Sequence, residues 1–97
     1  MLYRITNVNN RGNIGRADTS VVGRIVDFDL FDIRKHVGSS EPFLIQCVTD
    51  FSGTPYSPRQ KASMPLKNIL SVNWFNGKRT IVIEDREVIY TFDKVGK

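Results

Sequence analysis

The chain has 97 residues, with 14 Lys and Arg against 10 Asp and Glu, which gives a formal net charge of +4. Because 40% of the residues are hydrophobic, the composition excludes a disordered chain and indicates one folded domain over residues 1–97. No apolar run approaches the roughly 18–20 residues that cross a bilayer, and the N-terminus lacks the basic and apolar regions of a secretory signal. We therefore expect a cytoplasmic protein without membrane contact.

The first third of the chain predicts two strands. Leu2–Thr6 has the composition of a short strand at the edge of a sheet. The stretch 7–20 is rich in Asn and Gly and predicts a long loop. Within 21–31, apolar and acidic side chains alternate from Val26 to Leu30, which is the period of a strand with one face in water.

The middle of the chain predicts a central strand and a second loop. Pro42–Thr49 is apolar at nearly every position, which is typical of a strand with neighbours on both sides. A polar stretch containing Gly and Pro follows at 50–63 and predicts another long loop. No long segment has a helical period, and at most one helical turn fits around Met64–Ile69.

The clearest predicted unit is an antiparallel meander of three strands over residues 69–93. Asn76-Gly77 lies between two apolar, β-branched runs and predicts a type I′ hairpin turn, because both residues tolerate a positive φ. Asp85-Arg86 then separates the second strand from a third run at Glu87–Phe92.

Five or six short strands without a helix predict an all-β fold, either a small barrel or a strongly curved antiparallel sheet of the SH3-like or OB-like kind. The predicted core residues are Val26, Phe28, Leu30, Phe43, Ile45, Val72, Trp74, Val82 and Tyr90, with Leu44 and Val48 replacing Phe43 and Ile45 if the strand at 42–49 turns its other face inward. Apolar side chains on second strand faces, such as Phe75 and Ile89, exceed what one small barrel buries. They therefore predict a homo-oligomer.

The residues predict no catalytic site, no metal site and no cofactor. His36 is the one histidine, and the one cysteine, Cys47, lies in an apolar strand where a thiol acts as a packing group. The carboxylates of Asp27, Asp29 and Asp32 are too few for an oxygen-ligand cation site. We therefore expect a protein that is not an enzyme.

Two basic segments point to a phosphate-bearing ligand. Asn10–Arg16 combines glycines with arginines, so that backbone N–H and guanidinium groups can converge on an anion. Residues 57–80 carry five basic side chains and no acidic one, and neighbouring aromatic rings offer surfaces on which bases stack. The predicted contacts are Arg11, Arg16, Arg59, Lys61, Lys78 and Arg79, with Tyr56 or Phe75 for stacking. If the two segments share one face, the chain binds nucleic acid or a nucleotide.

The size of the chain, its all-β pattern and its end just past Tyr90-Thr91-Phe92 resemble small proteins of phages and mobile elements. Some proteins of that class bind a host protein, some a nucleic acid, and some sequester a nucleotide signal in an oligomer. The resemblance therefore implies an alternative to phosphate binding. In that alternative the long loops and an exposed strand edge contact a protein partner, as in a phage-type inhibitor of a host protein.

Overall fold

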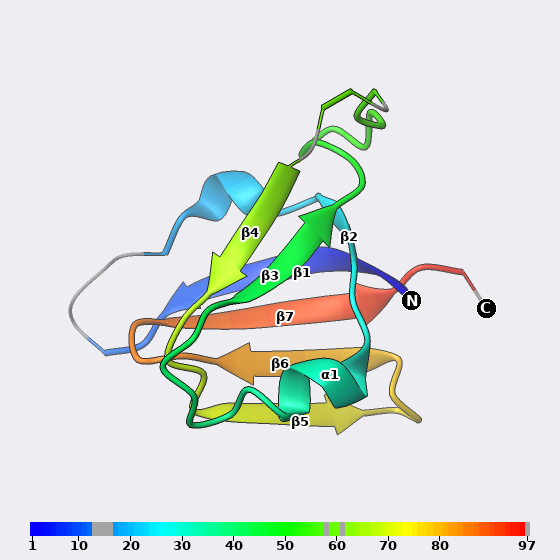
Figure 1. Cartoon of the computed structure of the whole chain (residues 1–97). Helices are drawn as coiled ribbons and strands as arrows, with labels where there is room; N and C mark the ends of the chain where they lie inside the picture. Colours follow the sequence, from blue (N-terminus) through cyan, green and yellow to red (C-terminus); the bar gives the residue numbers. More distant parts are fainter. Residues whose placement is uncertain (13–16, 58, 61, 97) are drawn as a thin grey trace.

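The computed structural model describes residues 1–12, 17–57, 59–60 and 62–96 (Figure 1). Within these residues, seven strands form one antiparallel sheet in the order β4-β3-β2-β1-β7-β6-β5. The strands are β1 (Leu2–Asn10), β2 (Ile25–Asp27), β3 (Phe43–Cys47), β4 (Ala62–Leu66), β5 (Ser71–Phe75), β6 (Thr80–Glu84) and β7 (Val88–Lys94). The same residues include the five-residue helix α1 (Leu30–Arg34) and a 3-10 helix at Thr19–Val21. The predicted all-β class is confirmed.

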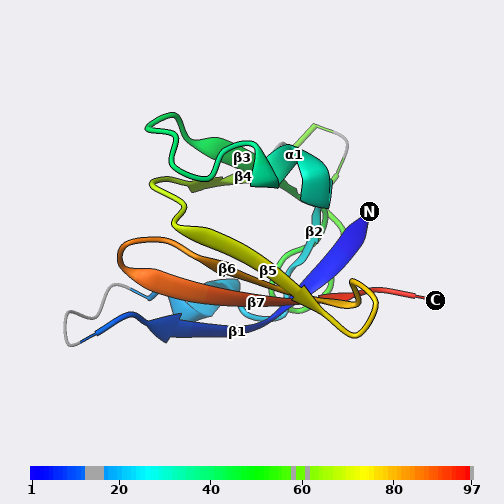
Figure 2. The ribbon, with the colours of Figure 1, turned by 90° about the horizontal axis from the view of Figure 1, so that it is seen from below.

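The sheet bends until its two halves face each other. Figure 2 shows β3 and β4 stacked over β5, β6 and β7, with α1 on the side of β3 and β4. Within the described residues β4 and β5 do not pair, so they are the two edges of an open sheet and no barrel closes. The described strands number seven, against the five or six expected from the sequence.

β1 is longer and more central than predicted. Leu2–Thr6 was expected to form a short edge strand, but β1 continues to Asn10 and pairs with β2 on one side and β7 on the other. The register with β7 shifts between Ile5 and Asn7, which keeps Val8 on the buried side although Asn residues flank it. The loop predicted for 7–20 is therefore shorter at its N-terminal end.

The C-terminal meander is confirmed, because β5 pairs with β6 and β6 pairs with β7. The first turn is longer than a two-residue type I′ turn, since Asn76, Gly77 and Lys78 all have positive φ, at 54°, 64° and 70°. Lys78 thus belongs to the turn and not to the second strand. In the second turn, one Asp85 carboxylate oxygen accepts hydrogen bonds from the N–H groups of Glu87 and Val88, each at 2.7 Å.

The expectation of one strand over 21–31 is wrong, because β2 ends at Asp27 and α1 begins at Leu30. Asp29 caps the helix, since its carboxylate accepts hydrogen bonds from the N–H groups of Phe31 at 2.8 Å and Asp32 at 3.4 Å. Local capping thus prevails over the alternating pattern. The helical turn considered near Met64 is absent among the described residues, where β4 pairs with β3.

The core fills the space between the halves of the sheet and beneath α1. The most deeply buried side chains are Tyr3, Ile5, Val26, Ile33, Ile45, Leu66, Ile69, Ile81, Ile83 and Phe92. Of the predicted core residues, Val26, Phe28, Leu30 and Ile45 are buried, and Phe43, Val72 and Tyr90 pack half-buried against them. The alternative inward face of β3 is excluded, because Leu44 is 62% exposed.

Two core predictions are wrong. In β6, Ile81 and Ile83 are fully buried and Val82 lies on the other face. Three consecutive β-branched residues show no polar alternation, so the sequence pattern did not separate the faces. Trp74 pairs with Ile81 and is therefore on the core side, but it lies near the end of an edge strand and is 37% exposed.

Gly23 lies between β1 and the segment that follows β3, at a position with no room for a side chain. Its φ is +98°, its N–H donates to the carbonyl oxygen of Ile5 at 2.8 Å, and an added Cβ would lie 2.5 Å from the Phe51 carbonyl oxygen. We expect Gly23→Ala to lower the free energy of unfolding by about 2–3 kcal/mol, measured by urea denaturation. The matched control is Gly53→Ala, where φ is +86° but no atom lies within 4 Å. This control should lose only about 1 kcal/mol, and equal losses would contradict the close contact.

The cap of α1 gives a second expectation. Asp29→Ala removes the acceptor of two backbone N–H groups and should lower the free energy of unfolding by about 1 kcal/mol. Asp29→Asn keeps an oxygen in the same place and should retain most of the stability. A larger loss for Asn than for Ala in the same denaturation experiment would argue against the capping role.

Candidate functional site

The predicted contact residues that the structure describes do not gather at one place. Arg11 follows β1 and its Nε donates to a carboxylate oxygen of Glu84 at 2.8 Å, so this cation is already paired at the C-terminal end of β6. Lys78 and Arg79 precede the N-terminal end of the same strand. The length of β6 therefore separates these two residues from Arg11.

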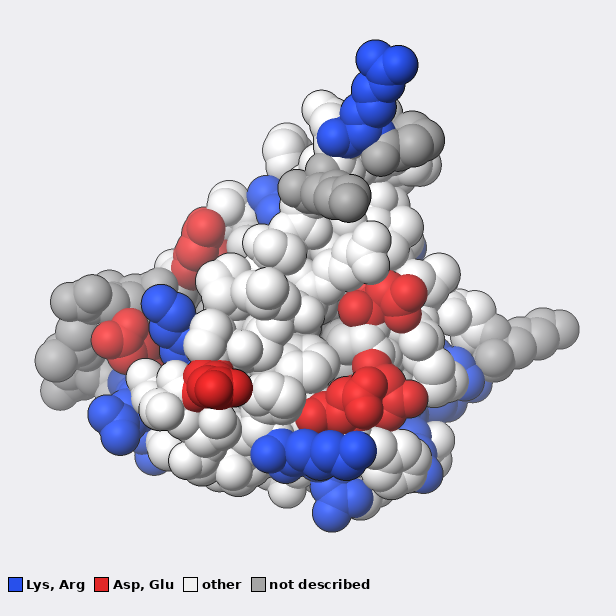
Figure 3. Space-filling model, viewed as in Figure 1, with Lys and Arg blue, Asp and Glu red and all other residues white. Residues whose placement is uncertain are grey.

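The other predicted contacts among the described residues are dispersed. Arg59 lies in the loop between β3 and β4, and Tyr56 in the same loop is half-buried against the core. Phe75 ends β5 and is 52% exposed. Arg16 and Lys61 lie outside the described residues. On the face drawn in Figure 3, acidic groups lie between the basic ones, so the described residues form no continuous basic area on that side.

Aromatic rings and cations do gather where α1 meets the β5–β6 turn. The guanidinium carbon of Arg34 lies 4.7 Å from the ring centroid of Trp74, and the Nζ of Lys78 lies 4.8 Å from that of Phe31. We call Phe31, Arg34, Lys35, Trp74 and Lys78 the α1–hairpin surface. Phe31 is 53% exposed and Trp74 is 37% exposed, so both rings remain accessible beside their cations.

α1 has one buried side and one exposed side, and its exposed side forms part of this surface. Leu30 and Ile33 are spaced three residues apart and are buried, which directs Phe31, Arg34 and Lys35 outward. Each exposed cation–π pair contributes roughly 0.5–1 kcal/mol. The two pairs therefore help to hold α1 against the hairpin while part of each ring stays exposed to water.

A cavity of about 220 Å³ lies beside this surface. Its lining consists of Met1, Tyr3, Asp29, Leu30, Phe31, Gly77, Lys78 and Lys94. Burial raises the pKa of Tyr3, and the carboxylate of Asp29 raises it further, so the phenol stays neutral. Besides the Asp29 carboxylate, which caps α1, the lining includes two lysines, Lys78 and Lys94, and the rings of Tyr3 and Phe31. This set suits a flat group that carries a negative charge.

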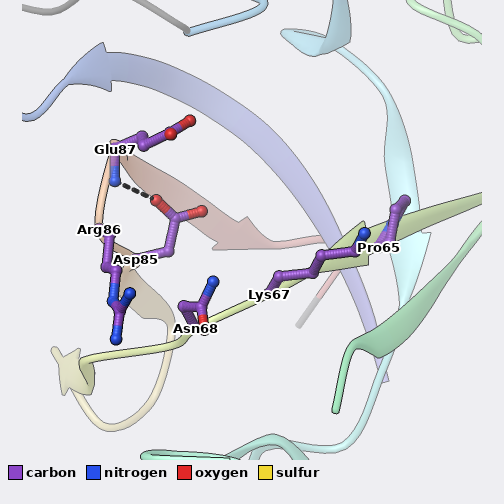
Figure 4. Close-up of a pocket in the computed structure, with 6 residues that line it drawn as sticks. All are labelled: Pro65, Lys67, Asn68, Asp85, Arg86 and Glu87. Atoms are coloured by element: carbon purple, nitrogen blue, oxygen red, sulfur yellow. Dashed lines mark hydrogen bonds between the residues drawn. The ribbon is translucent and has the colours of Figure 1, made fainter. Parts of the chain in front are cut away.

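A second cavity, of about 360 Å³, lies between the end of β4 and the β6–β7 turn (Figure 4). Its charged lining residues are Lys67, Arg86, Asp85 and Glu87, so cations and anions balance. Figure 4 shows the Lys67 side chain running toward Pro65, away from the turn. Because Asp85 already stabilises that turn and the charges balance, this cavity is less suited to an anion than the α1–hairpin surface.

Sequence reasoning missed most of the α1–hairpin surface. Lys78 was among the predicted contacts, but Phe31, Arg34 and Lys35 were not, and Trp74 was assigned to the core. The available signal was Asp29 immediately before two apolar residues at helical spacing, which marks a helix start. The alternation that ended at Leu30 concealed it.

Trp74 is the one tryptophan of the chain, so its fluorescence reports on this surface. We expect Arg34→Ala to increase quenching of Trp74 by acrylamide, because the guanidinium that covers the ring is removed. Lys35→Ala is the control, because it removes the neighbouring cation but not the guanidinium over the ring. Its quenching should be close to that of the unmodified protein. Unchanged quenching in Arg34→Ala would contradict the stacked arrangement.

Within the described residues, no three His, Cys, Asp or Glu side chains lie close enough together to hold a metal ion. In that same part of the chain, no helix has the length and apolar character needed to cross a membrane.

No protein-family model, curated protein or solved structure matches the chain.

Proposed function

We propose that the protein is a non-enzymatic binding module for a phosphate-bearing ligand, a nucleic acid or a nucleotide, with the α1–hairpin surface as its contact. The proposal rests on the two exposed aromatic rings that lie beside cations, Trp74 with Arg34 and Phe31 with Lys78. Stacking of a base on an aromatic side chain contributes roughly 1–3 kcal/mol. Neighbouring cations neutralise phosphates and release counterions.

The proposed contact keeps part of the set predicted from the sequence. Of that set, Lys78 lies in the α1–hairpin surface. Arg79 and Phe75 belong to the same hairpin and are exposed, but Phe75 lies on the opposite face of β5 from Trp74. Arg11 and Arg59 lie elsewhere, and the pairing of Arg11 with Glu84 makes it a weaker candidate.

A curved sheet with a ligand at its rim would match the arrangement of OB-like and SH3-like domains, the fold types that the sequence predicts for this chain. A cytoplasmic location would give access to both ligand types.

A single-stranded nucleic acid suits this surface better than a duplex. The two rings lie on different elements, α1 and β5, and each is partly exposed. Only unpaired bases present their faces to such rings, whereas a duplex offers phosphates and groove edges. A mononucleotide would occupy one ring together with the cavity that contains Lys78 and Lys94.

The test measures binding of a short single-stranded oligonucleotide by the change in Trp74 fluorescence at several salt concentrations. We expect the logarithm of the association constant to fall with the logarithm of salt, and Lys35→Ala or Lys78→Ala to reduce the steepness by about 0.7 each. A nucleotide should give saturable one-site binding and raise the melting temperature. The oligonucleotide should be recovered uncleaved.

Arg4→Ala is the matched control, because Arg4 is exposed while its neighbours Tyr3 and Ile5 are buried, so it lies on the outer face of β1. This variant should keep the salt dependence of the unmodified protein. If Arg4→Ala weakens binding as much as Lys78→Ala, the α1–hairpin surface is not the contact. If no oligonucleotide or nucleotide changes the fluorescence or melting temperature, the phosphate ligand is rejected and the protein-binding alternative stands.

A further inference from the structure

The two edges of the sheet differ in their protection against strand addition. The β4 edge contains Pro65, which has no N–H to offer a neighbouring strand, and Lys67 follows it. The β5 edge has neither device, because residues 68–77 contain no charged residue and no proline. One edge is therefore blocked against pairing and the other is open to it.

The β5 edge also carries exposed apolar side chains. Leu70 is 42% exposed, Trp74 37% and Phe75 52%, and Asn73 between them is exposed. Figure 2 views the molecule from the β5 side, with this strand in front of β6 and β7. α1 lies over one face of the sheet near β5 and leaves the outer edge of the strand free of other described strands.

The sequence of β5 is complementary to itself. When two copies pair in antiparallel fashion about Asn73, Val72 of one copy lies opposite Trp74 of the other, and the reverse pair forms by symmetry. Pairs of an aromatic with a β-branched residue are favourable across antiparallel strands. A two-fold axis also brings each residue near the axis close to its own copy, so an uncharged strand is what such an interface requires.

We propose that β5 pairs with β5 of a second copy of this chain, so that two seven-stranded sheets join across a two-fold axis at Asn73. Uncharged composition over 68–77, the exposed apolar residues and the Val72–Trp74 register all favour an identical chain over a partner of different sequence. The proposal is independent of the phosphate ligand, because its test measures the mass of the protein alone.

Light scattering after gel filtration at micromolar concentration should give about twice the 11.1 kDa mass of one chain. Asn73→Lys should give a single-chain mass, because two ammonium groups would face each other at the axis. Ser63→Lys is the matched control, since Ser63 is exposed on the other edge strand, β4, and this variant should remain dimeric.

Mixing Asn73→Lys with Asn73→Glu should restore a dimer, because opposite charges then meet at the axis. This restoration separates loss of the interface from loss of folding. A single-chain mass for the unmodified protein would overturn the proposal. A dimer that persists in Asn73→Lys, or one that Ser63→Lys disrupts, would place any interface elsewhere and overturn it as well.

Discussion

The pairing of β1 on both sides is the constraint on which the rest of the structure depends. β1 pairs with β2 and with β7, so it joins the half of the sheet formed by β2–β4 to the half formed by β5–β7. Beneath it, Tyr3 stacks on Phe28 with ring centroids 4.7 Å apart, and Phe28 meets Phe92 edge-on at 5.2 Å. This aromatic cluster fixes the bend between the halves. Because β1 is central, β4 and β5 remain as the edges.

Because the sheet bends, α1 lies close to the β5–β6 hairpin and forms the α1–hairpin surface with it. Its buried side supplies Leu30 and Ile33 to the core, and its outer side brings Phe31 and Arg34 to the β5–β6 hairpin. The same short helix therefore contributes to stability through apolar burial and to the proposed ligand contact through exposed rings and cations. A change that displaces the helix, such as loss of the Asp29 cap, affects both together.

Trp74 links the two proposals. It pairs with Arg34 in the α1–hairpin surface, and it lies opposite Val72 of a second copy in the proposed dimer. A two-fold axis perpendicular to the joined sheet keeps α1 of both copies on the same face. In such a dimer the two ligand surfaces would lie side by side, so a nucleic acid strand long enough to span them would bind more tightly than a mononucleotide.

The sequence by itself determined the features whose cause lies within a few residues. Asn76-Gly77 located the first turn of the meander, because Asn and Gly accept a positive φ most readily, although the turn also includes Lys78 and is longer than predicted. The tertiary structure alone decided whether Leu2–Asn10 lies at an edge or in the centre, and which face of Ile81–Ile83 is buried. These outcomes depend on partners distant in the chain, and an unbroken apolar run fits either face equally well. The contact of Phe31 with Lys78 has the same origin, since the sheet must bend before α1 reaches the hairpin.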